Sequence, residues 1–382
     1  MAYNYSDNEE IFEPLNLQRF QLPSGSLKGK EIFVYYAFYD TSTLDKEEIF
    51  VALDEETILP LEWAEIKIIH GSSWAIVKLH RLPRSYEYDI NVCIVGPLFW
   101  YNDWPRVFLI LEKWRVNKVR KVLLHVHSMS QDTKRVLDYY IKKGLLEIRP
   151  YPMMPFTNEF DPNNHIFYTA QHLVTFMCSV WNVSETLLKV VERMDEEDLG
   201  SFTLKHNALG FLHGMIPNPW NFREFLKFDF LKSAIPYKVD VNGKYIMKTG
   251  KARVPWIHGM KKYFGKSNDV QISTDDILLL HLRNSYNDIK KKQNLFPEDQ
   301  IFQNLNTTEL SITLREIFGD EEPSFRPSLT DPILHECMKS ALSDTPGEDC
   351  LKTTGNGCFD VLKDLDDWLF AVPTEGSHYI PI

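Results

Sequence analysis

The stretch from Tyr88 to Pro150 constrains the fold most strongly, because apolar runs of strand length alternate there with segments of helical periodicity. The run Tyr88–Gly96 is almost continuously apolar, which is typical of a strand buried on both faces in a parallel sheet. Two further runs, Lys121–His127 and Leu145–Arg149, have the same character. The order therefore predicts strand, helix, strand, helix, strand.

Helix signals stand between these runs. Asp103 precedes the first helix, and Pro105 occupies a first-turn position where a missing N–H is harmless. Ser128 and Gln131 have capping-box spacing at the start of the second helix, and Gly144 stands where a helix usually stops. With two right-handed crossovers, the unit is expected to form half of a doubly wound α/β sheet.

Ligands of such sheets bind beyond the carboxyl ends of the strands, which directs attention to the loops Gly96–Asp103 and His125–Ser130. The G-x-G-x-x-G fingerprint of dinucleotide-binding sheets is excluded, because the loop after Val95 contains a single glycine, Gly96. The chain also lacks the G-x-S-x-G, H-E-x-x-H and P-loop patterns of common hydrolases and nucleotide-binding enzymes.

The flanking segments differ in character. Strand patterns precede the central stretch, among them Glu31–Asp40 and a hairpin over Trp63–Arg81, and another hairpin is expected over Tyr237–Met247. Helical patterns dominate after Asn284, in the segments Thr308–Phe318, Pro332–Leu342 and Asp360–Phe370. We therefore expect three parts: an irregular N-terminal lead-in, an α/β domain with extra N-terminal strands, and a helical C-terminal extension, over residues 1–30, 31–290 and 291–382.

Charge and cysteine content narrow the function classes. The formal net charge is -11, and a general nucleic-acid binder is more often basic, so nucleic acid is not an expected partner. The chain has no run of 18 apolar residues, and Met1–Glu13 carries no signal pattern, so as written it is expected to be soluble, with a cytoplasmic location open. Of the five cysteines, Cys93 is interpreted as a small core hydrophobe, and a Cys350–Cys358 disulfide is one option.

Several segments, in their order, resemble glycosyltransferase family 92. The resemblance covers the strand Phe33–Asp40, the strand and loop Val92–Phe99, the unit Trp104–Pro150, and the segments Lys251–Gly259 and Leu280–Arg283. It implies a GT-A-like fold and transfer of a hexose, typically galactose, from a UDP-sugar donor to a glycan acceptor. It also implies a Golgi or secretory membrane setting and a divalent cation such as Mn²⁺, which would neutralise the departing diphosphate.

The sequence departs from the family at the motif that usually holds the cation. Where the family carries Asp-x-Asp-Glu, this chain reads Cys178–Asn182, and no Asp or Glu occurs from Pro162 to Ser184. Manganese and magnesium prefer hard carboxylate oxygens, so no metal ligand is assigned. The pair Asp364 and Asp366 has D-x-D spacing, but it is interpreted as a solvated helix face.

Five residues are candidates for the donor cleft. Asp40 would contact the uracil or ribose, or is only a turn residue after its strand. Asp103 is a donor-binding candidate, although a helix N-cap is the favoured interpretation. Arg283 would clamp the diphosphate, with a surface ion pair as its alternative, while His281 and His258 would line the same cleft or be structural histidines.

Two function classes remain. The first is a family 92-like glycosyltransferase, for which no catalytic base can be identified from the sequence. The second is a catalytically inactive family member that binds a glycan, a nucleotide sugar or a protein partner, which the missing acidic motif favours.

Overall fold

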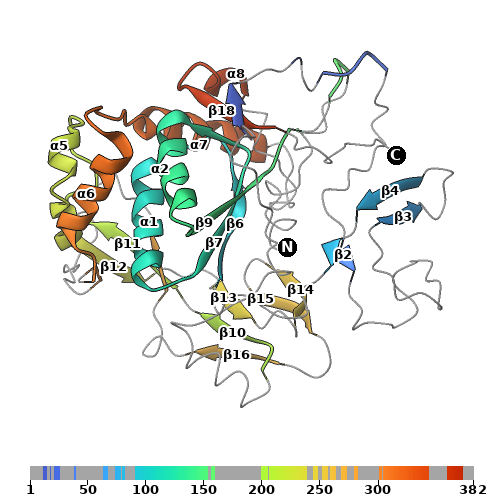
Figure 1. Cartoon of the computed structure of the whole chain (residues 1–382), viewed down its shortest axis with the longest axis horizontal. Coiled ribbons are helices and arrows are strands. Elements are labelled where there is room, and N and C mark those ends of the chain that lie inside the picture. Colours follow the sequence, from blue (N-terminus) through green and yellow to red (C-terminus); the bar gives the residue numbers. More distant parts are fainter. Residues whose placement is uncertain are drawn as a thin grey trace.

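Figure 1 shows the computed structural model of the whole chain, which describes part of the residues. These are residues 12–14, 18, 21–25, 38–39, 63–67, 74–78, 80–81, 91–153, 156–159, 199–204, 206–238, 244–247, 252–256, 259–263, 268–272, 279–282, 301–302, 304–343 and 359–372.

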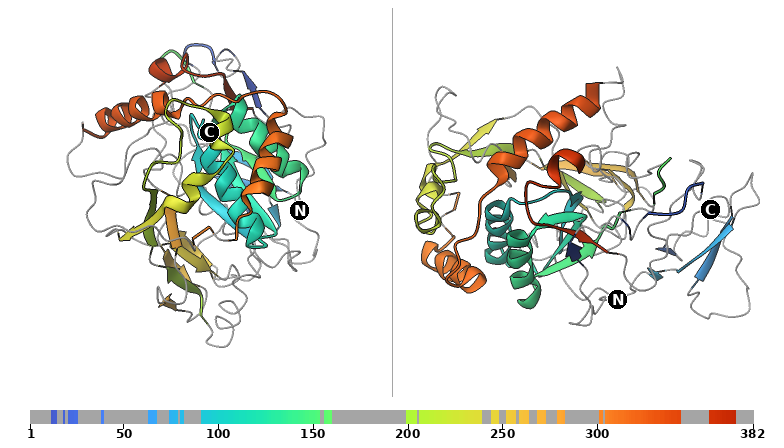
Figure 2. Two further views of the ribbon diagram at one scale, coloured as in Figure 1. Left: turned by 90° about the vertical axis from the view of Figure 1, so that its left-hand side faces the viewer. Right: turned by 90° about the horizontal axis from the view of Figure 1, so that it is seen from above.

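A three-stranded parallel sheet with two crossover helices forms the centre of the described structure. Strands β6 (Asn91–Leu98), β7 (Lys121–Val126) and β9 (Leu146–Pro150) pair in the order β6-β7-β9. Helices α1 (Trp104–Val116) and α2 (Gln131–Lys142) connect them. The right-hand view of Figure 2 shows the two helices together on one side of the sheet. The strand and helix order predicted for Tyr88–Pro150 is therefore confirmed.

Helix α1 has a side-chain cap at its start and a left-handed residue after its end. The Asp103 side chain accepts a hydrogen bond from the backbone N–H of Arg106 at 3.1 Å, which satisfies one of the open donors of the first turn. After the last turn, Lys118 adopts a φ of 59°, and the Val119 N–H donates back to the Trp114 carbonyl at 3.1 Å. This arrangement is the Schellman type of helix ending.

Helix α2 begins two residues later than its capping-box pattern predicted. Ser130 is the N-cap, and its Oγ accepts from the Thr133 N–H at 3.2 Å. Ser128 instead belongs to the short strand β8 (Ser128–Ser130), whose backbone pairs elsewhere. The predicted stop at Gly144 is correct, because Gly144 has a φ of 74° and directly follows the C-cap residue.

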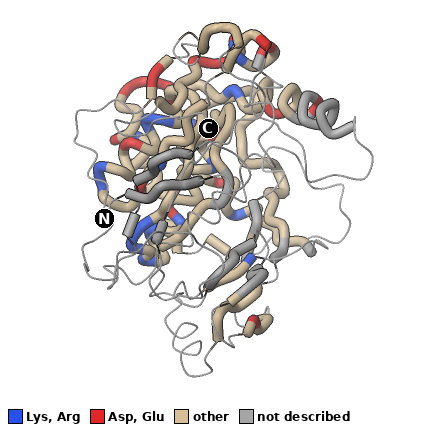
Figure 3. The backbone as a smooth tube through the Cα atoms, turned by 90° about the vertical axis from the view of Figure 1, so that its right-hand side faces the viewer, with Lys and Arg blue, Asp and Glu red and all other residues tan. Residues whose placement is uncertain are grey.

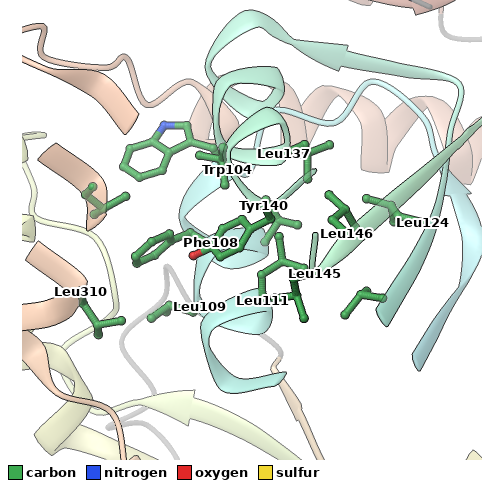
Figure 4. Close-up of a cluster of buried hydrophobic side chains, with 14 of the residues drawn as sticks. Trp104, Phe108, Leu109, Leu111, Leu124, Leu137, Tyr140, Leu145, Leu146 and Leu310 are labelled. Carbon is green, nitrogen blue, oxygen red and sulfur yellow. The ribbon is translucent and has the colours of Figure 1, made fainter. Parts of the chain in front are cut away.

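The hydrophobic core lies between the helices and one face of the parallel sheet. Strand residues Val122, Leu124 and Val126 are fully buried in it, and their alternation with outward neighbours follows the two-residue period of a strand. Figure 4 shows the side chains of Trp104, Phe108, Leu109, Leu111, Leu124, Leu137, Tyr140, Leu145, Leu146 and Leu310 in this cluster. The packing of the helices on one face of the sheet therefore determines which strand residues point toward its opposite face.

A carboxylate is buried within the same core. Glu112 of α1 has no exposed surface, and its oxygens accept a 2.6 Å hydrogen bond from the Tyr140 hydroxyl and bonds from the Arg115 guanidinium at 2.8 to 3.2 Å. Arg115 lies at the surface, so the ion pair of Glu112 and Arg115 extends from the core to the solvent. A buried carboxylate is tolerated here because each oxygen has a donor.

The N-terminal strands form small pairs. Strands β3 (Trp63–Lys67) and β4 (Trp74–Lys78) are antiparallel neighbours, which confirms the predicted hairpin. Strands β2 (Phe38–Tyr39) and β5 (His80–Arg81) pair in parallel.

Within the described residues, strands β10 to β17 form two three-stranded sheets and one pair. The sheet orders are β13-β10-β16 and β12-β11-β17, and β14 pairs with β15. The hairpin expected over Tyr237–Met247 is wrong, because β12 pairs with β11 and β13 pairs with β10. The bounds are β10 (Ser201–Leu204), β11 (His206–Phe211), β12 (Ala234–Lys238), β13 (Lys244–Met247), β14 (Ala252–Trp256), β15 (Gly259–Tyr263), β16 (Asp269–Ile272) and β17 (Leu279–Leu282).

Between β11 and β12, an aromatic segment covers the outer side of α1. It contains helix α5 (Phe222–Phe225) and the 3-10 helix η5 (Asp229–Ser233). Phe222, Phe225 and Phe228 are buried, so this segment is part of the core, as its sequence indicated.

The C-terminal part is not entirely helical. Helices α6 (Thr307–Phe318), α7 (Pro327–Ser343) and α8 (Phe359–Leu362) are followed by strand β18 (Trp368–Ala371). The helix expected over Asp360–Phe370 is therefore wrong after Leu362. Strand β18 lies between β8 and the N-terminal strand β1, which is formed by Phe12–Pro14 in the lead-in expected to be irregular. These two distant segments join the central unit through backbone pairing, which local sequence patterns do not reveal.

We expect Glu112→Ala to lower the free energy of unfolding by about 2–3 kcal/mol, because the buried Tyr140 hydroxyl loses its acceptor. Urea unfolding monitored by circular dichroism measures the change. The matched control is Glu309→Ala, which removes the exposed carboxylate 3.6 Å from Arg115 and should change stability by less than about 0.5 kcal/mol. Equal effects of the two substitutions would contradict a structural role for the buried carboxylate.

Candidate functional site

The carboxyl ends of β6, β7 and β9 bring the two loops chosen from the sequence into contact. The Tyr101 N–H donates to the Ser128 carbonyl at 3.1 Å, and the Ser130 N–H donates to the Tyr101 carbonyl at 2.9 Å. The His127 N–H donates to the Leu98 carbonyl at 2.9 Å. The backbones of the loops after β6 and β7 are therefore held as one unit at the edge where ligands of α/β sheets bind.

Aromatic side chains from the C-terminal strand pack on this edge. Trp100 has a φ of 49°, and its N–H donates to the Ser128 Oγ at 2.7 Å. Its ring meets the rings of Trp368 and Phe370 edge-on, each with a centroid distance of 5.2 Å. A left-handed tryptophan is uncommon, and such conformations persist only where the surroundings hold them. Strand β18 therefore both covers and supports the loop after β6.

Asn102 links this loop to the C-terminal part. Its Nδ2 donates to the Asp366 Oδ2 at 2.9 Å, and its Oδ1 accepts from the Thr330 hydroxyl at 3.0 Å. The Asp366 side chain is only 6% exposed and lies 3.6 Å from the Arg326 guanidinium. The interpretation of the Asp364–Asp366 pair as a solvated face is therefore wrong for Asp366, although Asp364 is exposed.

Four ionisable side chains interact beside the start of α1. Asp103 forms an ion pair with Arg106, with an Oδ2–Nε distance of 2.7 Å. Asp331 is exposed at the surface, but partial desolvation and the charge of Asp103 raise its pKa to about 6, against the opposing charge of Arg106. Burial and the charge of Asp103 also raise the pKa of Tyr101 well above its ordinary value. A carboxyl group with a pKa near neutrality can accept or release a proton under physiological conditions.

Two buried histidines of β7 and its loop are neutral. Burial lowers the pKa of His125 to about 3, and the charge of Arg149 adds to that effect. Burial alone lowers the pKa of His127 to about 3. Among the described residues, nothing forms a hydrogen bond with either ring nitrogen of His125 or with the Nε2 of His127, while the His127 ring stacks on Phe99 at 4.4 Å. These rings are packing elements, to which the sequence assigned no chemistry.

Polar residues alternate onto the face of the sheet that α1 and α2 do not cover. His125 and Arg149 stand in register on β7 and β9, between strand residues that face the helices. Cys93 of β6 is disulfide-bonded. The interpretation of Cys93 as a small core hydrophobe is therefore wrong, because a strand pattern shows burial but not the approach of a distant cysteine.

The structure places one of the five cleft candidates at this edge. Asp103 lies there as the N-cap of α1, with its carboxylate oxygens bonded to Arg106. His281 belongs to β17, where its backbone pairs with Ala208, but its side chain is outside the described part. Three candidates lie outside the described residues altogether, namely Asp40, His258 and Arg283. Asp331 was not predicted from the sequence. Its neighbour Asp103 is distant along the chain, and local helix patterns do not reveal such contacts.

The described residues do not fit the divalent cation that the family resemblance implies. Among them, no group of three or more His, Cys, Asp or Glu side chains comes together in a way that could hold a metal ion. Asp103 and Asp331 are two carboxylates, but the Arg106 guanidinium occupies the first. Residues 178–182, which stand in place of the family's acidic motif, lie outside the described part.

Residues 88–196 match the family model of glycosyltransferase family 92. This confirms the resemblance over the stretch that contains β6, α1, β7, α2 and β9. No curated protein matches the chain. None of the helices in the described part is long and apolar enough to span a membrane.

Acidification should unfold the chain through its buried histidines. The unfolded chain takes up protons below the ordinary histidine pKa of 6.5, whereas His125 and His127 stay neutral in the fold down to about pH 3. Stability is therefore complete above pH 6.5 and falls between pH 6.5 and 3, by about 1.4 kcal/mol per pH unit for each histidine.

Urea titrations at several pH values measure this effect. At pH 7, the variant His125→Leu should unfold at the same or a higher urea concentration than the wild type, since it removes unpartnered polar atoms. Below pH 6.5, its stability should fall less steeply with decreasing pH, and this dependence is the acid slope. The control His213→Gln, at an exposed position, should keep the wild-type slope. An unchanged acid slope in His125→Leu would disprove the assignment.

The raised pKa of Asp331 predicts the opposite pH dependence. Between its ordinary value of 3.8 and about 6, the folded state holds a proton that the unfolded state releases, so the stability contributed by this group is lost as the pH rises through that window. Asp331→Asn should therefore gain stability relative to the wild type between pH 4 and 7. Asp320→Asn, an exposed control, should show no such gain in the same thermal unfolding series.

Proposed function

We propose that this chain is a glycosyltransferase-like protein that transfers a hexose, with galactose as the first candidate, from a UDP-sugar to a glycan acceptor. The observation that carries the proposal is the match of residues 88–196 to glycosyltransferase family 92, which falls on the parallel strand and helix unit. A parallel sheet with crossover helices is compatible with a GT-A-like fold. The contact between the two loops at its carboxyl edge supports that edge as the ligand side.

In this proposal the nucleotide lies over residues 96–103. Arg283 clamps the diphosphate, because a guanidinium presents paired donors to phosphate oxygens. Asp40 accepts a hydrogen bond from the uracil or ribose, and His258 and His281 line the cleft. Asp103 contributes by holding the start of α1 and the ion pair with Arg106 in place beneath the donor.

Transfer also needs a proton acceptor. The acceptor hydroxyl oxygen forms the new bond to the anomeric carbon, the bond from that carbon to the diphosphate oxygen breaks with its electron pair, and the hydroxyl proton must leave. Asp331 is the described carboxyl group at this edge whose pKa, raised to about 6, suits that task. We assign it this role within the proposed reaction.

The second candidate function is a non-catalytic family member that binds a glycan, a nucleotide sugar or a protein partner. Two observations favour it. The residues Cys178–Asn182 replace the family's acidic motif, and Trp368 and Phe370 pack over the loop after β6. Either function is proposed for the Golgi or secretory pathway, and the disulfide of Cys93 supports an oxidising compartment.

Calorimetric titration of the purified chain with UDP, with and without Mn²⁺, separates these candidates. Binding that tightens strongly with Mn²⁺ supports the transferase, and metal-independent binding supports the nucleotide-binding module. Arg283→Gln should weaken UDP binding by about tenfold or more, since a charge-assisted contact to phosphate is lost. The control Arg223→Gln, at an 85% exposed side chain of α5, should bind UDP as the wild type does. Absence of UDP binding under both conditions would refute the donor site.

A further inference from the structure

We propose that a second pocket, at the opposite end of the parallel sheet from the donor edge, binds a small phosphate-bearing ligand. The pocket has a volume of about 540 Å³ and lies where the last turns of α1 and α2 meet α6. That volume is in the range of pockets that hold small molecules. Nothing in the proposed transfer reaction uses this end of the sheet.

Positive charge gathers in this pocket although the chain as a whole is acidic. Its lining has four cationic side chains and two carboxylates, in a chain with a net charge of -11. Figure 3 shows that basic and acidic residues are unevenly distributed over the described backbone. The cationic residues of the pocket are Arg115, Lys118, Arg120 and Lys143, and the carboxylates are Glu112 and Glu309.

The two carboxylates are directed at one of these cations. Glu112 accepts bonds from Arg115, and Glu309 lies 3.6 Å from the same guanidinium. Lys118 is exposed and makes no hydrogen bond or ion pair through its side chain within the described part of the chain. Lys143 is exposed too, with Glu316 at the 4.0 Å limit of an ion pair. The two lysines can therefore turn toward a bound anion without breaking a buried contact.

Backbone geometry adds a second observation at Lys118. The two helices that end at the pocket have the same type of C-terminal turn, but Gly144 provides the left-handed residue after α2 and Lys118 provides it after α1, at φ values of 74° and 59°. Glycine adopts this conformation without strain, whereas a lysine does so unfavourably. The conformation of this turn therefore does not explain why a lysine is present. The lysine does place an ammonium group at the pocket.

The remaining lining defines what kind of anion fits. The Tyr139 ring lies under the Lys143 ammonium at 5.0 Å, and Ile312 exposes 51% of its surface at the pocket. A Cβ placed on Gly144 would meet nothing within 4 Å, so this wall is open. An aromatic and aliphatic wall beside two mobile ammonium groups suits a compact organic phosphate, such as a sugar phosphate, better than a bare metal or a neutral glycan.

The alternative explanation is that the cations only compensate the negative ends of α1 and α2. Several terminal carbonyls already have partners, since the Trp114 and Tyr140 carbonyls accept from Val119 and Leu145, and the Gly144 carbonyl accepts from Lys121. Compensation of helix ends predicts a stability effect without ligand binding. A phosphate site predicts a binding effect without a stability effect.

Calorimetric titration of the full chain with inorganic pyrophosphate at about 0.15 M ionic strength distinguishes them. We expect binding with a dissociation constant of about 1 mM or lower. Lys118→Gly should weaken it by about tenfold and leave the thermal midpoint unchanged or higher, because glycine suits the left-handed turn. Lys143→Gln should weaken it similarly. Lys134→Gln, on α2 but paired with Asp138 at 2.7 Å, is the matched control and should bind like the wild type.

Three results would overturn the proposal. One is the absence of pyrophosphate binding to the wild-type chain. Another is an equal loss in Lys134→Gln, which would indicate diffuse charge rather than a site. The third is unchanged binding in both pocket variants with loss in Arg283→Gln, which would place the phosphate at the donor edge instead. Because the pocket and donor-edge variants are separate, failure of this site leaves the proposed transferase function untouched.

Discussion

The packing of α1 and α2 against one face of the β6-β7-β9 sheet determines where the polar groups of the central unit lie. Once Val122, Leu124 and Val126 turn toward the helices, their neighbours on the same strands must face the other way. That alternation directs His125 and Arg149 to the opposite face of the sheet. The helix axes follow the strands in reverse, so both helices start at the carboxyl edge and both end at the amino edge.

The two edges consequently have different chemistry. At the carboxyl edge, Asp103 and Asp331 stand near Arg106, and strand β18 packs its aromatic side chains over the adjoining loop. At the amino edge, helix endings and Lys118 line an open cationic pocket. The proposed transfer reaction uses the first edge, and the second is available for a separate ligand. Physical separation of the two edges allows each to be tested without disturbing the other.

Local patterns in the sequence predicted the central unit well, because strand and helix periods depend on neighbouring residues. They placed the stop of α2 at Gly144 and the N-cap at Asp103 correctly. They failed where distant segments decide the outcome. Ser128 pairs with β18 and so cannot cap α2, and Cys93 bonds to a remote cysteine. The raised pKa of Asp331 likewise arises from a tertiary neighbour.

In the proposed function, the carboxyl edge of this sheet receives the nucleotide part of a sugar donor. Hydrogen–deuterium exchange of the whole chain, with and without saturating UDP, tests it directly. We expect slower exchange in peptides covering residues 96–103 and 125–130 when UDP is bound, because those loops carry the proposed contacts. Slower exchange confined to residues 112–120 and 139–145, at the other edge, would contradict it.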